Sequence, residues 1–209
     1  VEEGELFFLQ TRTGKRAPWA ALRIATALVT EGLLEPSEAL ARLEALPLDR
    51  LERVALAAGP NDLPVARATP ASAGVASGAL VLDARRAAVL AANTPVILVR
   101  TELSTDDLSG MAAATGLLTT FGGRTSHAAV VARQLGKVCL VGCAELSIQD
   151  AARTCLLGGH RLHEGDPLTL DADHGFVYAG IVPTVRERPE PELAVVQQWR
   201  RAAAAAASV

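Results

Sequence analysis

Residues 121–137 read Phe121-Gly122-Gly123-Arg124-Thr125-Ser126-His127-Ala128-Ala129-Val130-Val131-Ala132-Arg133-Gln134-Leu135-Gly136-Lys137, and this stretch is the most informative part of the sequence. Its pattern is that of a strand end, a glycine loop, a helix and a glycine stop. Two glycines let backbone amides approach a ligand closely, Thr125 or Ser126 can cap the helix, and Gly136 can take the left-handed conformation that ends it. The pattern therefore places His127 in the first turn of a helix.

The position of His127 indicates a chemical role. At a helix N-terminus, the macrodipole and the unpaired amides favour an anion and disfavour an imidazolium cation. We expect a neutral, nucleophilic histidine that can stabilise an attached phosphoryl group. From the residues alone, another interpretation stays open: His127 only caps the helix or is partly buried, and Gly122-Gly123 is a tight turn, because a glycine pair before a helix is common.

The block from Gly122 to Cys143 closely resembles the phosphohistidine signature of the pyruvate, phosphate dikinases, which belong to the phosphoenolpyruvate-utilising enzymes. The resemblance rests on the core GG-x-TSHAAVVAR and on the pattern that follows it, Gly136-Lys137-x-Cys139-x-x-Gly142-Cys143. It implies a mobile domain whose His127 accepts a pyrophosphoryl group from ATP. One phosphoryl group then passes to inorganic phosphate and the other to pyruvate, making phosphoenolpyruvate. Phosphoenolpyruvate synthases share the glycine pair and the Thr-x-His, but usually lack this cysteine pairing.

The loop before His127 matches the resemblance with two departures. The expected phosphoryl loop is formed by Gly122, Gly123, Arg124 and Ser126. Arg124 stands where dikinases usually have methionine, and in this it resembles the synthases. Phe121 stands where arginine or another residue is common. The Arg124 guanidinium could help to hold phosphate.

Thr125 corresponds, by the same resemblance, to a threonine that a regulatory kinase phosphorylates in some dikinases. A phosphate dianion two residues from His127 would repel an incoming phosphate and occupy the same amides. A simple capping role for Thr125 remains open.

The amino-terminal segment from Leu6 to Arg16 resembles the last strand of an ATP-grasp domain. A spacing of two puts Gln10 and Arg12 on one face of a strand, and the resemblance implies that both contact the nucleotide. Solvated polar residues at a strand end are the alternative. The family's acidic metal ligand would precede Val1, so we expect ATP and Mg²⁺ to be bound mainly by an ATP-grasp domain outside this chain, which is then part of a longer protein.

The predicted fold class is α/β, a swivelling β/β/α phosphohistidine domain preceded by a small helical segment. We expect the end of the ATP-grasp domain in residues 1–16, a helical segment and linker in 17–64, the phosphohistidine domain in 65–182, and a connector with a C-terminal helix or tail in 183–209. Turn chemistry in residues 57–64 marks the domain boundary. Beyond it, strands near 78–82, 95–99, 116–120 and 138–141 alternate with helices that Asp83 and a Ser104/Asp107 capping box begin.

Composition excludes several classes of function. The 209 residues include 20 basic and 23 acidic side chains, which leaves no broad basic surface for nucleic acid. Apolar runs are far shorter than the roughly 20 residues that cross a bilayer. The three cysteines predict reduced, buried thiols and a cytoplasmic protein. We expect no metal site: His160 and His163 flank a hairpin, Cys139 and Cys143 have no second pair, and Asp171 and Asp173 belong to a turn.

The resemblance also implies partners. They are an ATP-grasp domain and a phosphoenolpyruvate- or pyruvate-binding domain, in the same chain or another, a regulatory kinase and phosphatase, and a second copy in a homodimer. Two competing hypotheses are a synthase-like or other phosphotransferase with a different acceptor, and a non-catalytic regulatory module that keeps the carrier fold.

Overall fold

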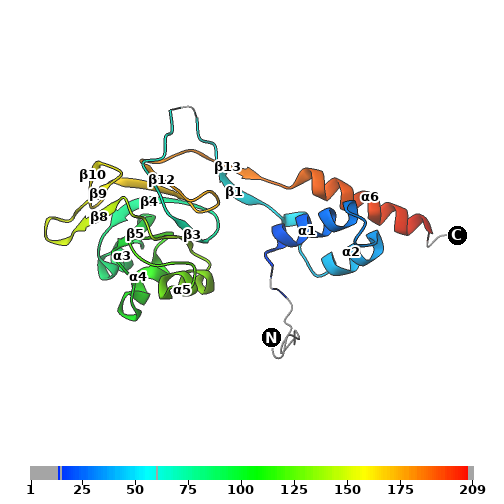
Figure 1. The fold of residues 1–209 in the computed structure, drawn as a ribbon, viewed down its shortest axis with the longest axis horizontal. Helices are drawn as coiled ribbons and strands as arrows, with labels where there is room; N and C mark the ends of the chain where they lie inside the picture. Colours follow the sequence, from blue (N-terminus) through cyan, green and yellow to red (C-terminus); the bar gives the residue numbers. More distant parts are fainter. Residues whose placement is uncertain (1–13, 15, 60, 207–209) are drawn as a thin grey trace, which may run out of the picture. The chain divides into compact units, whose positions relative to one another are not determined.

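The structure, a computed structural model, describes residues 14, 16–59 and 61–206, and it divides into two compact units (Figure 1). A helical unit takes in the chain up to Glu52 and again from Arg188, and an α/β unit spans Arg53–Glu187. The predicted ATP-grasp strand, with Gln10 and Arg12, lies outside the described residues.

The centre of the α/β unit is an eight-stranded sheet. Its order is β2-β12-β11-β4-β5-β6-β7-β3, and the four strands β4 to β7 run parallel while the outer neighbours are antiparallel. The strands are β2 (Ala66–Arg67), β3 (Thr69–Ser72), β4 (Val75–Val81), β5 (Val96–Arg100), β6 (Gly116–Thr119), β7 (Val138–Val141), β11 (Pro167–Asp171) and β12 (Phe176–Ala179).

The sheet is covered on both faces. Helices α3 (Ala84–Leu90), α4 (Leu108–Ala113) and α5 (His127–Leu135) cover one face, and a sheet of β10 (His160–His163), β9 (Thr154–Leu157) and β8 (Leu146–Gln149) covers the other (Figure 1). Residues of β5 alternate between the two cores: Val96 and Leu98 pack toward the helices, whereas Ile97 and Val99 pack toward the small sheet. All four side chains are fully buried, so both faces of this short apolar strand must pack against another layer. The predicted β/β/α fold class is confirmed.

Local sequence signals act where they were expected. Asp83 caps α3 by accepting a hydrogen bond from Arg86 N, and the Ser104/Asp107 capping box forms across the 3₁₀ turn η2 (Thr105–Asp107) before α4. Gly158 and Gly159 both have positive φ in the tight turn between β9 and β10. The Asp171 carboxylate accepts from the N–H groups of Asp173 and His174, as its predicted turn role requires.

The helical unit has its own core. Helices α1 (Pro18–Thr30), α2 (Pro36–Leu43) and α6 (Glu190–Ala206), with the 3₁₀ turn η1 (Leu48–Arg50), bury a leucine-rich cluster. Leu193 and Val196 of α6 join this cluster beside Leu22 of α1, and Arg23 lies 3.4 Å from Glu192. From the sequence we expected a separate connector with a C-terminal helix or tail in residues 183–209, and α6 is the helix of this segment. In the structure α6 completes the core that α1 and α2 begin, because the apolar side chains along one face of α6 are buried by packing against those helices.

The α/β unit also extends beyond the predicted range of 65–182. Strands β1 (Arg53–Leu56) and β13 (Thr184–Glu187) pair antiparallel at its two ends, and Arg53 Nη2 lies 2.9 Å from Glu187 Oε2. The turn-rich residues 57–64 therefore belong to a segment between β1 and β2 inside the unit. Turn chemistry marks a change of direction, and it does so within a domain as well as between domains.

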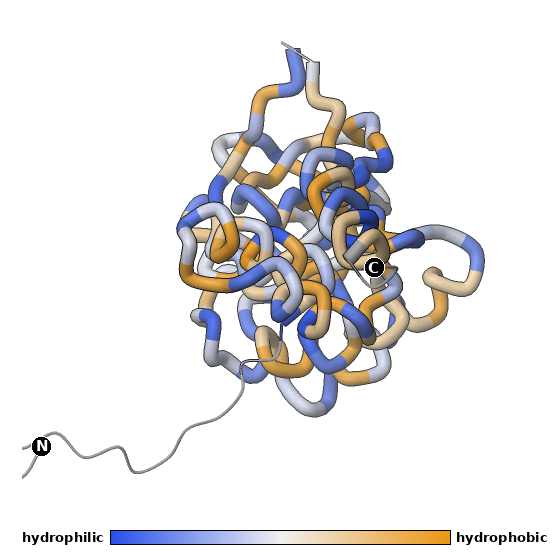
Figure 2. Tube along the Cα trace, turned by 90° about the vertical axis from the view of Figure 1, so that its right-hand side faces the viewer, coloured by the Kyte–Doolittle hydropathy of each residue, from blue (hydrophilic) through white to orange (hydrophobic). Residues whose placement is uncertain are grey.

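Hydrophobic residues along the chain occur in short stretches broken by hydrophilic ones (Figure 2). Among the residues that the structure describes, none of the helices combines the length and the apolar character needed to cross a membrane.

Candidate functional site

The loop that carries His127 starts at the carboxyl end of β6, next to the end of β5. Thr120 N donates to the carbonyl oxygen of Arg100 at 3.1 Å, and Phe121 N donates to that of Thr101 at 3.0 Å. Thr119 Oγ1 adds a 2.6 Å hydrogen bond to the Phe121 carbonyl oxygen. The loop thus leaves the edge where parallel sheets bind their ligands, outside the carboxyl ends of the strands.

Two glycines meet where the loop crosses the end of β7. Gly122 has φ +111°, and a Cβ atom there would lie 3.1 Å from Ser126 Oγ. Gly142 has φ +67°, and a Cβ atom on it would lie 2.8 Å from the Gly122 carbonyl oxygen. Gly123, by contrast, faces open space. Gly142 therefore allows a backbone approach to Gly122 that a side chain on Gly142 would block, and the positive φ of Gly122 favours glycine there.

Helix α5 begins at the candidate nucleophile. Ser126, and not Thr125, is the N-cap residue, and its hydroxyl accepts a 3.4 Å hydrogen bond from Ala129 N. His127 is the first helical residue, and its side chain is exposed. Within the described part of the chain, the N–H groups of His127 and Ala128 donate no hydrogen bond. These two amides are the unpaired donors that make a helix N-terminus an anion site.

The far end of α5 matches the predicted glycine stop. Gly136 has φ +63°, and Lys137 N donates to the Ala132 carbonyl oxygen at 2.9 Å. The helix is thus fixed at both ends, and its nine residues hold Ala128, Ala129 and Ala132 against the central sheet.

The side chains of Arg124 and Thr125 are exposed beside His127. No hydrogen bond or ion pair of either side chain occurs among residues 14, 16–59 and 61–206. The Arg124 backbone does have a partner: its carbonyl oxygen accepts from Arg133 Nη2 at 2.9 Å. Sequence reasoning missed Arg133, because its one local signal is its place on the last turn of the helix that His127 begins.

The three cysteines have the environment of core residues. Burial raises the pKa of Cys139 to about 12, although the nearby Arg133 guanidinium lowers it, and burial raises the pKa values of Cys143 and Cys155 to about 11. Such thiols stay protonated at neutral pH. His160 and His163 are exposed on β10, and within the described ranges no three His, Cys, Asp or Glu side chains gather as metal ligands would.

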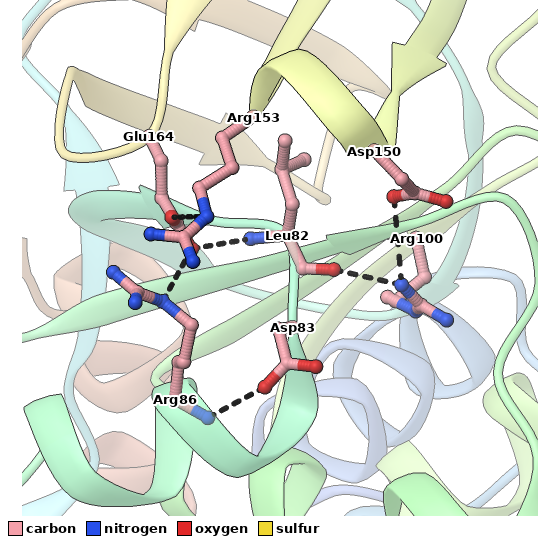
Figure 3. A pocket seen from close by; sticks show the side chains of 7 residues that line it. All are labelled: Leu82, Asp83, Arg86, Arg100, Asp150, Arg153 and Glu164. Atoms are coloured by element: carbon pink, nitrogen blue, oxygen red, sulfur yellow. Dashed lines mark hydrogen bonds and ion pairs between the residues drawn. The ribbon is translucent and has the colours of Figure 1, made fainter.

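A polar cavity of about 210 Å³ lies at the carboxyl ends of β4 and β5 (Figure 3). Its Glu164 carboxylate, with a side chain only 9% exposed, lies 3.2 Å from Arg86 Nε and 3.9 Å from Arg153 Nε. Arg100 Nη1 donates to the Leu82 carbonyl oxygen at 2.8 Å and lies 3.8 Å from Asp150. Three arginines thus face three carboxylates, counting Asp83. We interpret this cluster as a structural network joining the two sheets, because its balanced charges offer an anion no net attraction.

Comparisons with known proteins agree with this geometry. Residues 92–175, which include the loop and α5, match the family model of the PEP-utilising enzyme, mobile domain. The chain is 47% identical over 190 residues to pyruvate, phosphate dikinase of Clostridium symbiosum, covering 88% of this chain and 21% of the relative. It is 39% identical over 183 residues to pyruvate, phosphate dikinase of Entamoeba histolytica, again covering 88% and 21%.

The chain therefore spans about a fifth of the length of the curated relatives it matches. Among solved structures, the N-terminal domain of Enzyme 1 - Nitrogen is 26% identical, with a TM-score of 0.30 over 53% of this chain and 37% of that chain.

Proposed function

We propose that this chain is the phosphoryl-carrying part of a pyruvate, phosphate dikinase-like phosphotransferase, with His127 as the carrier. One observation supports this most directly: an exposed imidazole on the first residue of α5, next to two amide N–H groups without a partner. A phosphoryl group on His127 would lie close to these donors and to the positive end of the helix dipole. The similarity to dikinases over 88% of the chain supports the choice of substrates.

The proposed reaction has three transfers. A ring nitrogen of His127 attacks the β-phosphorus of ATP, and the bond from that phosphorus to the α–β bridging oxygen breaks, releasing AMP. An oxygen of inorganic phosphate then attacks the γ-phosphorus, which releases pyrophosphate and leaves the β-phosphoryl group on the histidine. The enolate oxygen of pyruvate, after loss of a methyl proton, takes this group and frees the imidazole. Each step exchanges one bond to phosphorus, so the protein's task is to position and to stabilise charge.

The other reactants need other domains. We assign ATP and Mg²⁺ mainly to an ATP-grasp domain, with Gln10 and Arg12 at its end, and pyruvate to a separate domain, in cis or in trans. Location in the cytoplasm and homodimer formation remain part of the proposal. Thr125 is the proposed target of a regulatory kinase, since its exposed side chain lies two residues before His127.

The test is to incubate the natural full-length protein with Mg²⁺ and ATP labelled at the β-phosphate. We expect label that is acid-labile and base-stable, as phosphohistidine is, and its loss in His127→Ala. The matched control is His160→Ala, which removes an exposed imidazole from β10 and should keep the label. Equal labelling of His127→Ala and the natural protein would disprove the carrier role.

A synthase-like acceptor is the second candidate, and Arg124 is the observation that favours it. The dikinase-like and synthase-like reactions differ in the acceptor of the γ-phosphoryl group. If phosphate accepts it, ATP labelled at the γ-phosphate yields labelled pyrophosphate and turnover needs added phosphate; if water accepts it, the label appears as free phosphate. We expect pyrophosphate, and phosphate-independent release of free phosphate would instead support the synthase-like reaction.

A further inference from the structure

Arg133 connects three parts of the α/β unit. Its Nη2 donates to the carbonyl oxygen of Arg124 at 2.9 Å, and its Nη1 donates to the carbonyl oxygen of Ala71 in β3 at 2.9 Å. The guanidinium thus ties the residue that starts the Arg124–His127 segment to an edge strand of the central sheet. Both hydrogen bonds come from a charged donor, which makes them stronger than bonds between neutral groups.

The helix geometry explains why residue 133 can do this. In an α-helix the Cα–Cβ bonds tilt toward the N-terminus, so a long side chain on the last turn lies back along the helix. Arg133 is nine residues after Arg124 and six after His127, and its side chain spans this distance. The planar fork of arginine can donate in two directions at once, whereas lysine offers a single point charge.

The segment that Arg133 holds has few other restraints. Ser126 N donates to the Gly123 carbonyl oxygen at 3.0 Å, and the Ser126 cap on Ala129 N is long at 3.4 Å. The side chains of Arg124 and Thr125 are exposed. Without the bond to Arg124, this turn would lose its one hydrogen-bonded link to β3 among the described residues.

From these contacts we infer that Arg133 is a positioning residue for phosphoryl transfer: it holds the Arg124–Ser126 turn against β3 so that His127 and the unpaired amides face the incoming phosphorus together. This inference rests on the proposed carrier function of His127. It assigns Arg133 no contact with a substrate. Its effect is on geometry, and a misplacement of about 1 Å can cost about 100-fold in rate.

The experiment compares Arg133→Met, which keeps an unbranched stem without donors, with Arg133→Lys, which keeps the charge without the fork. Arg85→Met is the matched control, because Arg85 is an exposed helical arginine on α3 with no hydrogen bond or ion pair in the described chain. In the natural full-length protein, single-turnover labelling of His127 from ATP gives a maximal rate and an ATP concentration at half-maximal rate. Amide hydrogen exchange of Ser126 and Ala129, whose N–H groups donate the hydrogen bonds of this turn, gives a second readout that needs no phosphate.

We expect the maximal rate to fall by about 10-fold or more in Arg133→Met and by less in Arg133→Lys, with an unchanged half-maximal ATP concentration. Exchange at Ser126 and Ala129 should rise in both, and Arg85→Met should match the natural protein. Natural rate and natural exchange in Arg133→Lys and Arg133→Met would overturn the inference, and if the methionine variant does not fold, the lysine variant alone decides it. If the natural protein takes no label on His127, the carrier proposal fails, while the exchange data still test whether Arg133 orders the turn.

Discussion

A single methyl group at Gly142 should disturb the His127 loop from the end of the neighbouring strand β7. Gly142 follows β7, and an alanine there would put its Cβ 2.8 Å from the carbonyl oxygen of Gly122. This separation is about 0.6 Å shorter than the 3.4 Å at which ordinary contacts begin. Because Gly122 itself has φ +111°, the loop has little freedom to move away without losing its own conformation.

The loss of stability in Gly142→Ala has two causes, the left-handed backbone and the crowding of the Gly122 carbonyl. The variant Gly136→Ala measures the first cause alone. Gly136 has φ +63°, close to the +67° of Gly142, but a Cβ there would meet no atom within 4 Å. Gly136→Ala should therefore cost only the left-handed backbone term, about 1–2 kcal/mol. Gly142→Ala should cost this and the displacement of the Gly122 carbonyl, about 2–4 kcal/mol in all. If about 1 Å costs about 100-fold, a shift of about 0.6 Å should slow the labelling of His127 by about 10-fold.

The assay measures both quantities in the natural full-length protein. Native-state amide exchange of β6 and β7 gives the change in the opening free energy, and single-turnover labelling from ATP gives the rate. Gly142→Ala should exceed Gly136→Ala in both. Equal free energies and equal rates in the two variants would refute the reasoning that the Gly142–Gly122 approach supports the loop.

Two further predictions concern the helix cap and the thiols. Ser126→Ala should raise amide exchange in the first turn of α5 by an amount equal to about 0.5–1 kcal/mol, because the cap it removes is a long one, and Ser126→Asp should keep the natural exchange. Burial raises the pKa of Cys139 from 9.0 to about 12, so between these pH values the unfolded thiol loses its proton first and stability falls as the pH rises. Urea unfolding followed from pH 8 to 11 should show this fall, and a slope in Cys139→Ala as steep as in the natural protein would contradict the assignment to this thiol.

The elements that the sequence predicted well carry their signals locally. The cap at Asp83, the capping box at Ser104, and the stop at Gly136 each depend on residues within four positions. The alternation in β5 also has a local cause, since an apolar run of this length must be covered on both faces. These signals suffice to predict strands and helices and to place His127 in the first turn of a helix.

The misplaced boundaries depend on distant pairing. The pairing of β1 with β13 joins Arg53 to Glu187, and the core of the helical unit joins Leu22 to Leu193. In both pairs, the residues next to each partner in the sequence do not indicate which distant residue it will contact. The turn-rich residues 57–64 were the strongest local signal of a domain boundary, but they lie inside the α/β unit. The α/β unit begins at β1 because β1 pairs with β13 at the other end of the unit.

The same reasoning explains why the supports of the candidate site were missed although its centre was predicted. His127, Gly122 and Ser126 are consecutive enough for loop and cap rules to place them, but Arg133 reaches the loop from the last turn of α5, and Gly142 approaches it from the end of β7. Arg133 binds the Arg124 carbonyl oxygen, and Gly142 leaves room for the Gly122 carbonyl oxygen, so neither support uses the amides that the helix N-terminus leaves free. A loop held by its carbonyl groups keeps its N–H groups available for an anion. For this reason, variants at either support should lower the rate of phosphoryl transfer while the His127 side chain itself is unchanged.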